Sequence, residues 1–112
     1  MNAIQLIDET VSAYAADPPA LRSRDNLGTC MYVTNDGRKC AIGRCLNKKF
    51  VHQAARHNFE HILSQVKARY KGFSQQFWRD LQELHDNNKN WDKNGLTEYG
   101  QTEVRYMKGT YK

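Results

Sequence analysis

Three cysteines are the most reactive side chains in this chain of 112 residues. Cys30, Cys40 and Cys45 are odd in number and no export signal is recognisable, so we expect free thiols, a metal site or a reactive sulfur. With His52 or His85 they could supply four ligands to a tetrahedral zinc ion. Their spacings differ from the close cysteine pairs of zinc fingers. We therefore favour the alternative, buried thiols that pack as small apolar side chains, and expect no metal or other cofactor.

Cys40 is also the candidate nucleophile of a cysteine enzyme. Such chemistry needs a base that takes the thiol proton and a third group that orients the base. His85 is the candidate base, and Asp86 or Asp36 is the candidate orienting carboxylate. Because His85 borders the apolar stripe of a predicted helix, the alternative is a hydrogen-bonded histidine that closes the core. We expect the second arrangement, and hence a binding protein more than an enzyme.

His57 and His61 are spaced as neighbours on one turn of a helix. Two imidazoles at this spacing can chelate a metal ion, but the sequence offers no obvious third ligand beside them. A helical projection places both away from the apolar stripe of their predicted helix. We therefore expect them to face solvent.

Positive charge is concentrated in the middle of the chain. Residues 29–72 carry a net charge of +7, whereas residues 1–28 carry −2 and residues 73–112 carry none. Five cations that lie close in sequence are called the basic rim: Arg38, Lys39, Arg44, Lys48 and Lys49. A turn at Gly43 and the amide hydrogens of a helix start suit the rim to a phosphate or another anion, and Tyr32 could stack on a base. The alternative is a charged loop that is only solvated.

The elements that would position these residues begin with a helix over residues 3–16. Asn2 and Gln5 form the pattern of a capping box, and Asp17-Pro18-Pro19 ends the helix. A β-hairpin is predicted next, with strands over 30–34 and 38–42 around an Asp-Gly turn. In the expected register Tyr32 lies opposite Cys40, and Cys30 lies opposite Ile42.

Two further helices follow the hairpin. Apolar residues at three- and four-residue steps predict a long helix over residues 48–70. A second helix is predicted over 75–87, with Ser74 as its cap and Phe73 packed against Trp78 in a hydrophobic staple. Asn94-Gly95 predicts another turn, and for the tail we prefer a helix from about residue 97 to residue 108 over an edge strand at 102–107.

Length and pattern together predict one α+β domain over residues 1–112, with three or four helices packed on a β-hairpin and a flexible end at 108–112. No apolar run approaches the roughly 18 residues that a membrane span needs, so we expect no membrane association and a cytoplasmic protein. Exposed aromatics such as Trp91, Tyr106 and Tyr111 could form an interface in a structural or oligomeric role.

Two blocks of this sequence resemble a known pattern. They are Cys30-x-Tyr32 with Asp36-Gly37-x-x-Cys40-Ala41-Ile42-Gly43, and Leu81-Gln82-x-Leu84-His85-Asp86 followed by Trp91. In these blocks, which cover about half of the chain, it is similar to a group of short uncharacterised proteins of phages and bacteria. After the Ala-Ile-Gly step that group often has an acidic Pro-Asp stretch, where this chain has Arg44-Cys45-Leu46. The resemblance implies the provenance of a phage or mobile-element accessory protein, which would act in the host cytoplasm.

These observations lead to one functional prediction. We expect a small basic accessory protein that engages an anionic ligand, such as a nucleotide or nucleic acid, or an acidic host-protein surface through the basic rim. Inhibition of a host defence protein is the setting that the resemblance implies. A Cys/His-dependent enzyme and a zinc-stabilised or nucleic-acid-binding module are the alternatives. No nucleotide-binding or DNA-binding signature is present in the sequence.

Overall fold

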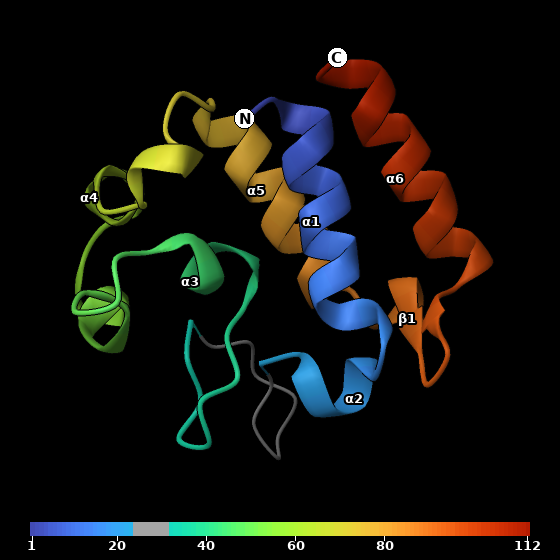
Figure 1. Ribbon diagram of the computed structural model, residues 1–112, viewed down its shortest axis with the longest axis horizontal. Coiled ribbons are helices and arrows are strands. Elements are labelled where there is room, and N and C mark those ends of the chain that lie inside the picture. Colours follow the sequence, from blue (N-terminus) through green and yellow to red (C-terminus); the bar gives the residue numbers. More distant parts are fainter. Residues whose placement is uncertain (24–31) are drawn as a thin grey trace.

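The first helix is set by its own opening residues. In the computed structural model, which describes residues 1–23 and 32–112, α1 spans Ala3–Ala15 (Figure 1). Asn2 Oδ1 accepts a hydrogen bond from the Gln5 amide, and Gln5 Oε1 accepts one from the Asn2 amide, both at 2.8 Å. The predicted capping box is thus confirmed. Pro18 and Pro19 follow the helix as expected, but they also open the short helix α2, Pro18–Leu21, because proline suits the first turn of a helix.

The predicted hairpin at 30–42 is only partly right. Thr34 donates from its amide to the Arg38 carbonyl at 2.8 Å, and Val33 and Lys39 form one isolated antiparallel bridge, so the expected register holds around the Asp-Gly turn. Gly37 supplies the positive φ of +87° that this turn needs. The predicted second strand is wrong beyond Cys40, since helix α3, Ala41–Cys45, begins there. Cys30 lies outside the described residues, and its predicted partner Ile42 is helical.

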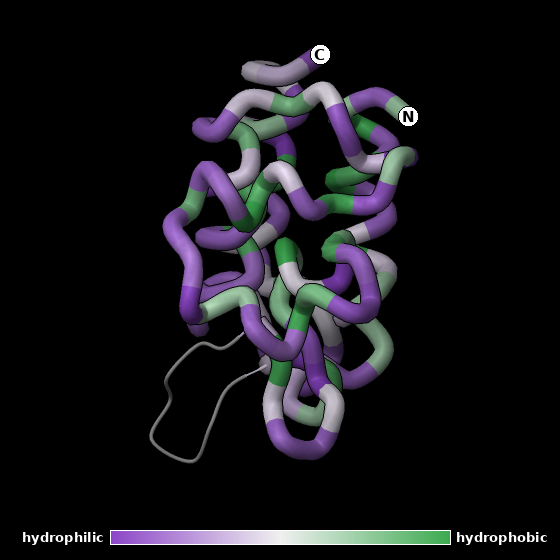
Figure 2. The backbone as a smooth tube through the Cα atoms, turned by 90° about the vertical axis from the view of Figure 1, so that its left-hand side faces the viewer, coloured by the Kyte–Doolittle hydropathy of each residue, from purple (hydrophilic) through white to green (hydrophobic). Residues whose placement is uncertain are grey.

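The long helix predicted over 48–70 is wrong. The segment forms the 3₁₀-helix η1, Val51–Arg56, then α4, Phe59–Ser64, and the 3₁₀-helix η2, Ala68–Tyr70. The chain folds back on itself here, and we call residues 48–70 the folded-back segment. The Asn47 amide donates to the Gln65 carbonyl and the Lys67 amide donates to the Cys45 carbonyl, both at 2.9 Å. A single helix would hold residues 46 and 66 far apart, so this long-range pairing replaces it. Figure 2, which views this segment from its own side, shows that hydrophilic residues make up much of the face.

The last third of the chain agrees with the sequence prediction. Helix α5 spans Gln75–Asp86, with Ser74 as its cap, and the Phe73 and Trp78 rings lie 6.0 Å apart in the expected staple. After the 3₁₀-helix η3, Asn88–Asn90, strands β1, Trp91–Asp92, and β2, Gly95–Leu96, pair antiparallel around the predicted turn. The tail is the helix α6, Glu98–Thr110. The edge strand weighed for the tail does not form.

The chain is thus a mixed helix and strand fold in which helices dominate. Helix α1 packs against α6, while α5 packs against both α3 and α6. The core is built mainly from these helices, and its largest buried side chains include Leu6, Ile7, Ile42, Phe77, Trp78 and Leu81. In the part of the chain that the structure describes, every helix is too short or too polar to cross a membrane.

Candidate anion-binding site

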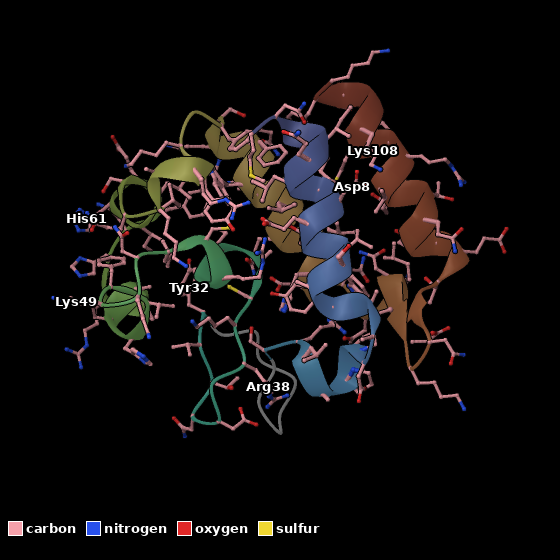
Figure 3. The ribbon with its side chains drawn as sticks, in the orientation of Figure 1. Asp8, Tyr32, Arg38, Lys49, His61 and Lys108 are labelled. Atoms are coloured by element: carbon pink, nitrogen blue, oxygen red, sulfur yellow. The ribbon has the colours of Figure 1, made fainter. Side chains whose placement is uncertain are left out.

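The fold divides the basic rim between two places. Arg38, Lys39 and Arg44 line one pocket of about 300 Å³, which we call the three-cation pocket. Lys48 and Lys49 are exposed and line a separate hollow. Figure 3 shows the separation, with Arg38 near the 34–37 turn and Lys49 at the far edge of the folded-back segment. The five cations therefore do not form one surface.

The three-cation pocket is assembled from four parts of the chain. Helix α1 contributes Ala13 and Tyr14, α2 contributes Leu21, and the 34–37 turn contributes Asp36 and Gly37. The buried Tyr14 hydroxyl donates to the Lys39 carbonyl at 2.6 Å and thereby fastens this part of the chain to α1. Cationic side chains and the apolar side chains of Ala13 and Leu21 thus line the same pocket.

Arg38 is held in place from two sides. Its Nε atom lies 3.0 Å from Asp36 Oδ1, and its Nη1 atom donates to the Arg22 carbonyl at 3.1 Å. The Thr34 hydroxyl and Arg38 both donate to Asp36, and these hydrogen bonds keep the pKa of this exposed carboxyl below its usual range. Asp36 thus offsets part of the positive charge at the mouth of the pocket.

The Arg44 side chain is somewhat less exposed than that of Arg38. Its Nη2 atom donates to Glu9 Oε2 at 3.1 Å, and its guanidinium lies over the Tyr70 ring. Glu9 is shared with Arg69, whose Nη2 lies 3.0 Å from Oε1. The Nε atom of Arg44 is buried and has no hydrogen-bond partner among the described residues. A buried donor without a partner costs free energy, so the Arg44 side chain is held mainly by its Nη2 contact with Glu9.

Lys39 is the third cation that lines the pocket. Its side chain is half-buried, and it takes part in no ion pair among the described residues. Three cations line the pocket against one lining carboxylate, that of Asp36. Even with Glu9 balanced against Arg69 and Arg44, the pocket keeps an excess of positive charge, which favours an anion.

Tyr32 does not reach the three-cation pocket. It lines a different hollow together with Val51 and His52. Burial, with a smaller contribution from Cys40, raises the pKa of its half-buried phenol. The predicted stacking of a base on Tyr32 therefore has no geometric link to the cations of the rim.

The described cysteines do not have the features of nucleophiles. Cys40 is 1% exposed, and its Sγ accepts a hydrogen bond from the Gly43 amide at 3.2 Å as the cap of α3. Burial raises the pKa of Cys40 and of Cys45 to about 12. Both groups are therefore thiols at neutral pH, and they pack in the core as small apolar side chains.

His85 has the structural role that its position in the sequence favoured. It is fully buried, and its Nδ1 lies 2.7 Å from Asp86 Oδ1. The Ser23 amide donates to Nε2 at 3.2 Å, so the ring proton lies on Nδ1 and is shared with Asp86. Among the described residues no hydrogen bond joins His85 to Cys40, so the candidate base and the candidate nucleophile are not coupled.

The fold also decides where the candidate metal ligands lie. No three His, Cys, Asp or Glu side chains in residues 1–23 and 32–112 are placed to hold a metal ion together, and Cys30 lies outside these ranges. His57 and His61 are exposed, as predicted, with ring centroids 4.6 Å apart.

Trp91, which we expected to be exposed, is buried, and its Nε1 donates to the Leu84 carbonyl at 2.7 Å.

Two residues of α1 that hold the basic rim in place carry no local signal in the sequence. Glu9 and Tyr14 reach the rim from α1, but they stand 35 and 25 residues away from their partners Arg44 and Lys39. No local spacing in the sequence indicates either contact. The acidic first segment beside a basic middle segment was the only available signal, and it does not say which charges meet.

Comparisons with known proteins add no relative: no family model, no curated protein and no solved structure matches this chain. The resemblance to short phage and bacterial proteins therefore stays a prediction. Any function has to be argued from the site itself.

Proposed function

We propose that this chain is a non-enzymatic binding protein that holds an anionic group, phosphate or carboxylate, in the three-cation pocket. The observation that carries the proposal is the charge of the pocket, which three cations line against the single lining carboxylate of Asp36. A phosphate or carboxylate forms strong charge-assisted hydrogen bonds with such cations. Lys39 is the cation most open to such a ligand, because no ion pair among the described residues engages it.

The size and walls of the pocket narrow the ligand class. At about 300 Å³ it stands at the lower end of the range for small-molecule sites. Ala13 and Leu21 add apolar surface beside the cations. These features favour a small phosphorylated or carboxylated molecule with an apolar or planar part, such as a nucleotide, over an extended polyanion.

A competing proposal uses the other half of the rim. Lys48 and Lys49 are exposed on the folded-back segment and could contact an acidic protein surface or a nucleic acid through general electrostatic attraction. The inhibition of a host defence protein belongs to this second proposal and depends on the sequence resemblance alone.

Paired lysine variants separate the two proposals. Calorimetric titration of the full chain with inorganic phosphate, adenosine monophosphate and a short single-stranded DNA, each at low and high salt, would measure the affinities. We expect adenosine monophosphate to bind and Lys39→Gln to weaken it about fivefold, the equivalent of roughly 1 kcal/mol. The matched variant Lys49→Gln should leave this affinity unchanged.

Salt gives a second readout. Binding to the pocket should weaken as salt rises, because the contact is between charges that remain partly exposed. The pocket proposal is wrong if neither phosphate nor the nucleotide binds. Equal losses from Lys39→Gln and Lys49→Gln, with DNA bound more tightly than the nucleotide, would support the broad basic face instead.

A further inference from the structure

A second groove, on a different part of the molecule, carries the opposite charge. Helices α5 and α6 each turn one stripe of residues toward it, spaced by three and four positions. The stripe of α5 and its C-cap consists of Asp80, Glu83, Leu84 and Asn87, and that of α6 consists of Tyr99, Glu103, Tyr106 and Met107. The groove has a volume of about 140 Å³. A cavity of roughly 150 Å³ can hold a benzene-sized molecule, so a short organic chain fits.

The charged side chains that line the groove are all acidic. Asp80, Glu83 and Glu103 are its charged side chains, and none of them joins an ion pair among the described residues. Asp80 already accepts hydrogen bonds from the Tyr111 hydroxyl and from Gln76 Nε2. Glu83 of α5 and Glu103 of α6 both line the groove, and their carboxylates accept no hydrogen bond among the described residues, so they are the carboxylates that remain for a ligand.

A buried amide among the lining residues of the groove is a second feature that suits a ligand that donates hydrogen bonds. Asn90, in η3, lines the groove and is 1% exposed, and its Oδ1 atom has no hydrogen-bond partner in the part of the chain that the structure describes. Its Nδ2 donates to the Leu84 carbonyl at 3.1 Å. This contact fixes the orientation of the amide, because the reverse orientation would place two carbonyl oxygens together. An acceptor without a partner among the described residues therefore belongs to a side chain that lines the acidic groove.

Two tyrosines that line the groove are suited to the same kind of ligand. Tyr99 is 48% exposed and Tyr106 is 71% exposed, although both are large aromatic side chains. The face of a tyrosine ring attracts an ammonium or guanidinium group. Carboxylates, an unused amide oxygen and exposed aromatic rings thus occur together in one place.

We propose that the groove between α5 and α6 binds an organic cation, an alkylammonium or alkylguanidinium group, with Glu83 and Glu103 as its charged partners and Asn90 Oδ1 as a further acceptor. The cation can come from a free amine or from a lysine or arginine side chain of a peptide, because the two present the same head group. This site is separate from the three-cation pocket and does not depend on the anion-binding proposal.

The test uses the full chain and two probes, putrescine for a free amine and the tripeptide Gly-Lys-Gly for a side chain. Calorimetry and backbone-amide NMR shifts would follow each titration. We expect saturable binding of at least one probe, with shifts in residues 80–90 and 99–107. Glu103→Gln should weaken the binding about fivefold, and Glu83→Gln on the opposite helix should weaken it similarly.

Two controls make the result decisive. Glu98→Gln removes the same charge from α6 outside the groove and should leave the affinity unchanged. The uncharged diol of the same chain length as putrescine should not bind. The proposal is overturned if neither cation binds at millimolar concentration, if the diol binds as well as putrescine, or if Glu98→Gln costs as much affinity as Glu103→Gln. Binding of only one probe identifies the source of the cation.

Discussion

Glu9 on α1 and Arg44 on α3 form an ion pair, with Oε2 3.1 Å from Nη2 and both side chains largely shielded from solvent. The same carboxylate also binds Arg69 at the end of the folded-back segment. The Glu9 carboxylate therefore links α1 both to Arg44, which lines the three-cation pocket, and to Arg69 in the folded-back segment.

Glu9→Gln should lower the free energy of unfolding at neutral pH by about 1 kcal/mol, because it leaves the guanidinium of Arg44 without its charged partner. Urea unfolding of the variant and the wild type would measure this difference. Asp8→Asn is the matched control. The Asp8 pair with Lys108 is at the surface, so its loss should cost clearly less.

The effect of Glu9→Gln should depend on pH. Burial alone would raise the pKa of Glu9, but the hydrogen bond and charge of Arg44, together with Tyr70 and Arg69, outweigh it, so the pKa lies below the ordinary value of 4.5. A carboxyl group with a lowered folded pKa stabilises the fold above its unfolded pKa, and this contribution is lost as the pH falls through the folded value. The difference between wild type and variant should therefore be complete at neutral pH and should shrink below pH 4.5. A difference that grows in acid would contradict the ion pair.

Gly43→Ala should destabilise the protein. A Cβ atom at Gly43 would stand 2.0 Å from the Tyr32 carbonyl oxygen, which is backbone and cannot rotate away. Overpacking of this kind typically costs about 1–3 kcal/mol. Gly109→Ala is the control, since its Cβ would meet nothing within 4 Å inside α6. That change should stabilise the helix by about 0.5–1 kcal/mol. Thermal unfolding of both variants would show shifts of opposite sign.

Cys40 and Cys45 should react slowly with iodoacetamide in the folded protein. With a pKa of about 12, only about one thiol in 10⁵ is ionised at neutral pH, and burial blocks access as well. Peptide mapping by mass spectrometry would follow each cysteine separately, before and after addition of urea. His85→Gln should not slow the labelling of Cys40. Rapid labelling that this substitution abolishes would instead favour the Cys/His enzyme.

Ser74→Ala should cost about 1 kcal/mol of stability. The Ser74 hydroxyl accepts a hydrogen bond from the Phe77 amide at 3.1 Å and so satisfies a free donor at the start of α5. Thr102→Ala on the exposed face of α6 removes a hydroxyl that caps nothing and serves as the control. Chemical denaturation would compare the two. Similar losses from both variants would mean that the cap adds no stability of its own.

Residues close to one another in the sequence determined much of the secondary structure. The capping box at Asn2 and Gln5, the serine cap of α5 and the turns at Gly37 and Gly95 all lie where the sequence placed them. Each of these features involves contacts within about four residues, so its pattern can be read directly from the chain. The structural role of His85 was also predictable, because its place beside an apolar stripe favours burial with a hydrogen bond.

Tertiary structure alone decided which distant residues meet. The apolar steps over 48–70 suit a helix, yet the pairing of Leu46 with Val66 breaks that helix into short pieces, since long-range packing outweighs modest helix propensity. The same holds for the candidate sites. Glu9 meets Arg44 over 35 residues, and the rim divides because Lys48 and Lys49 are carried away on the folded-back segment. The sequence by itself determined the helix ends, the turns and where positive charge is concentrated. Which charges share a pocket depends on how the helices pack, because such contacts carry no local sequence pattern.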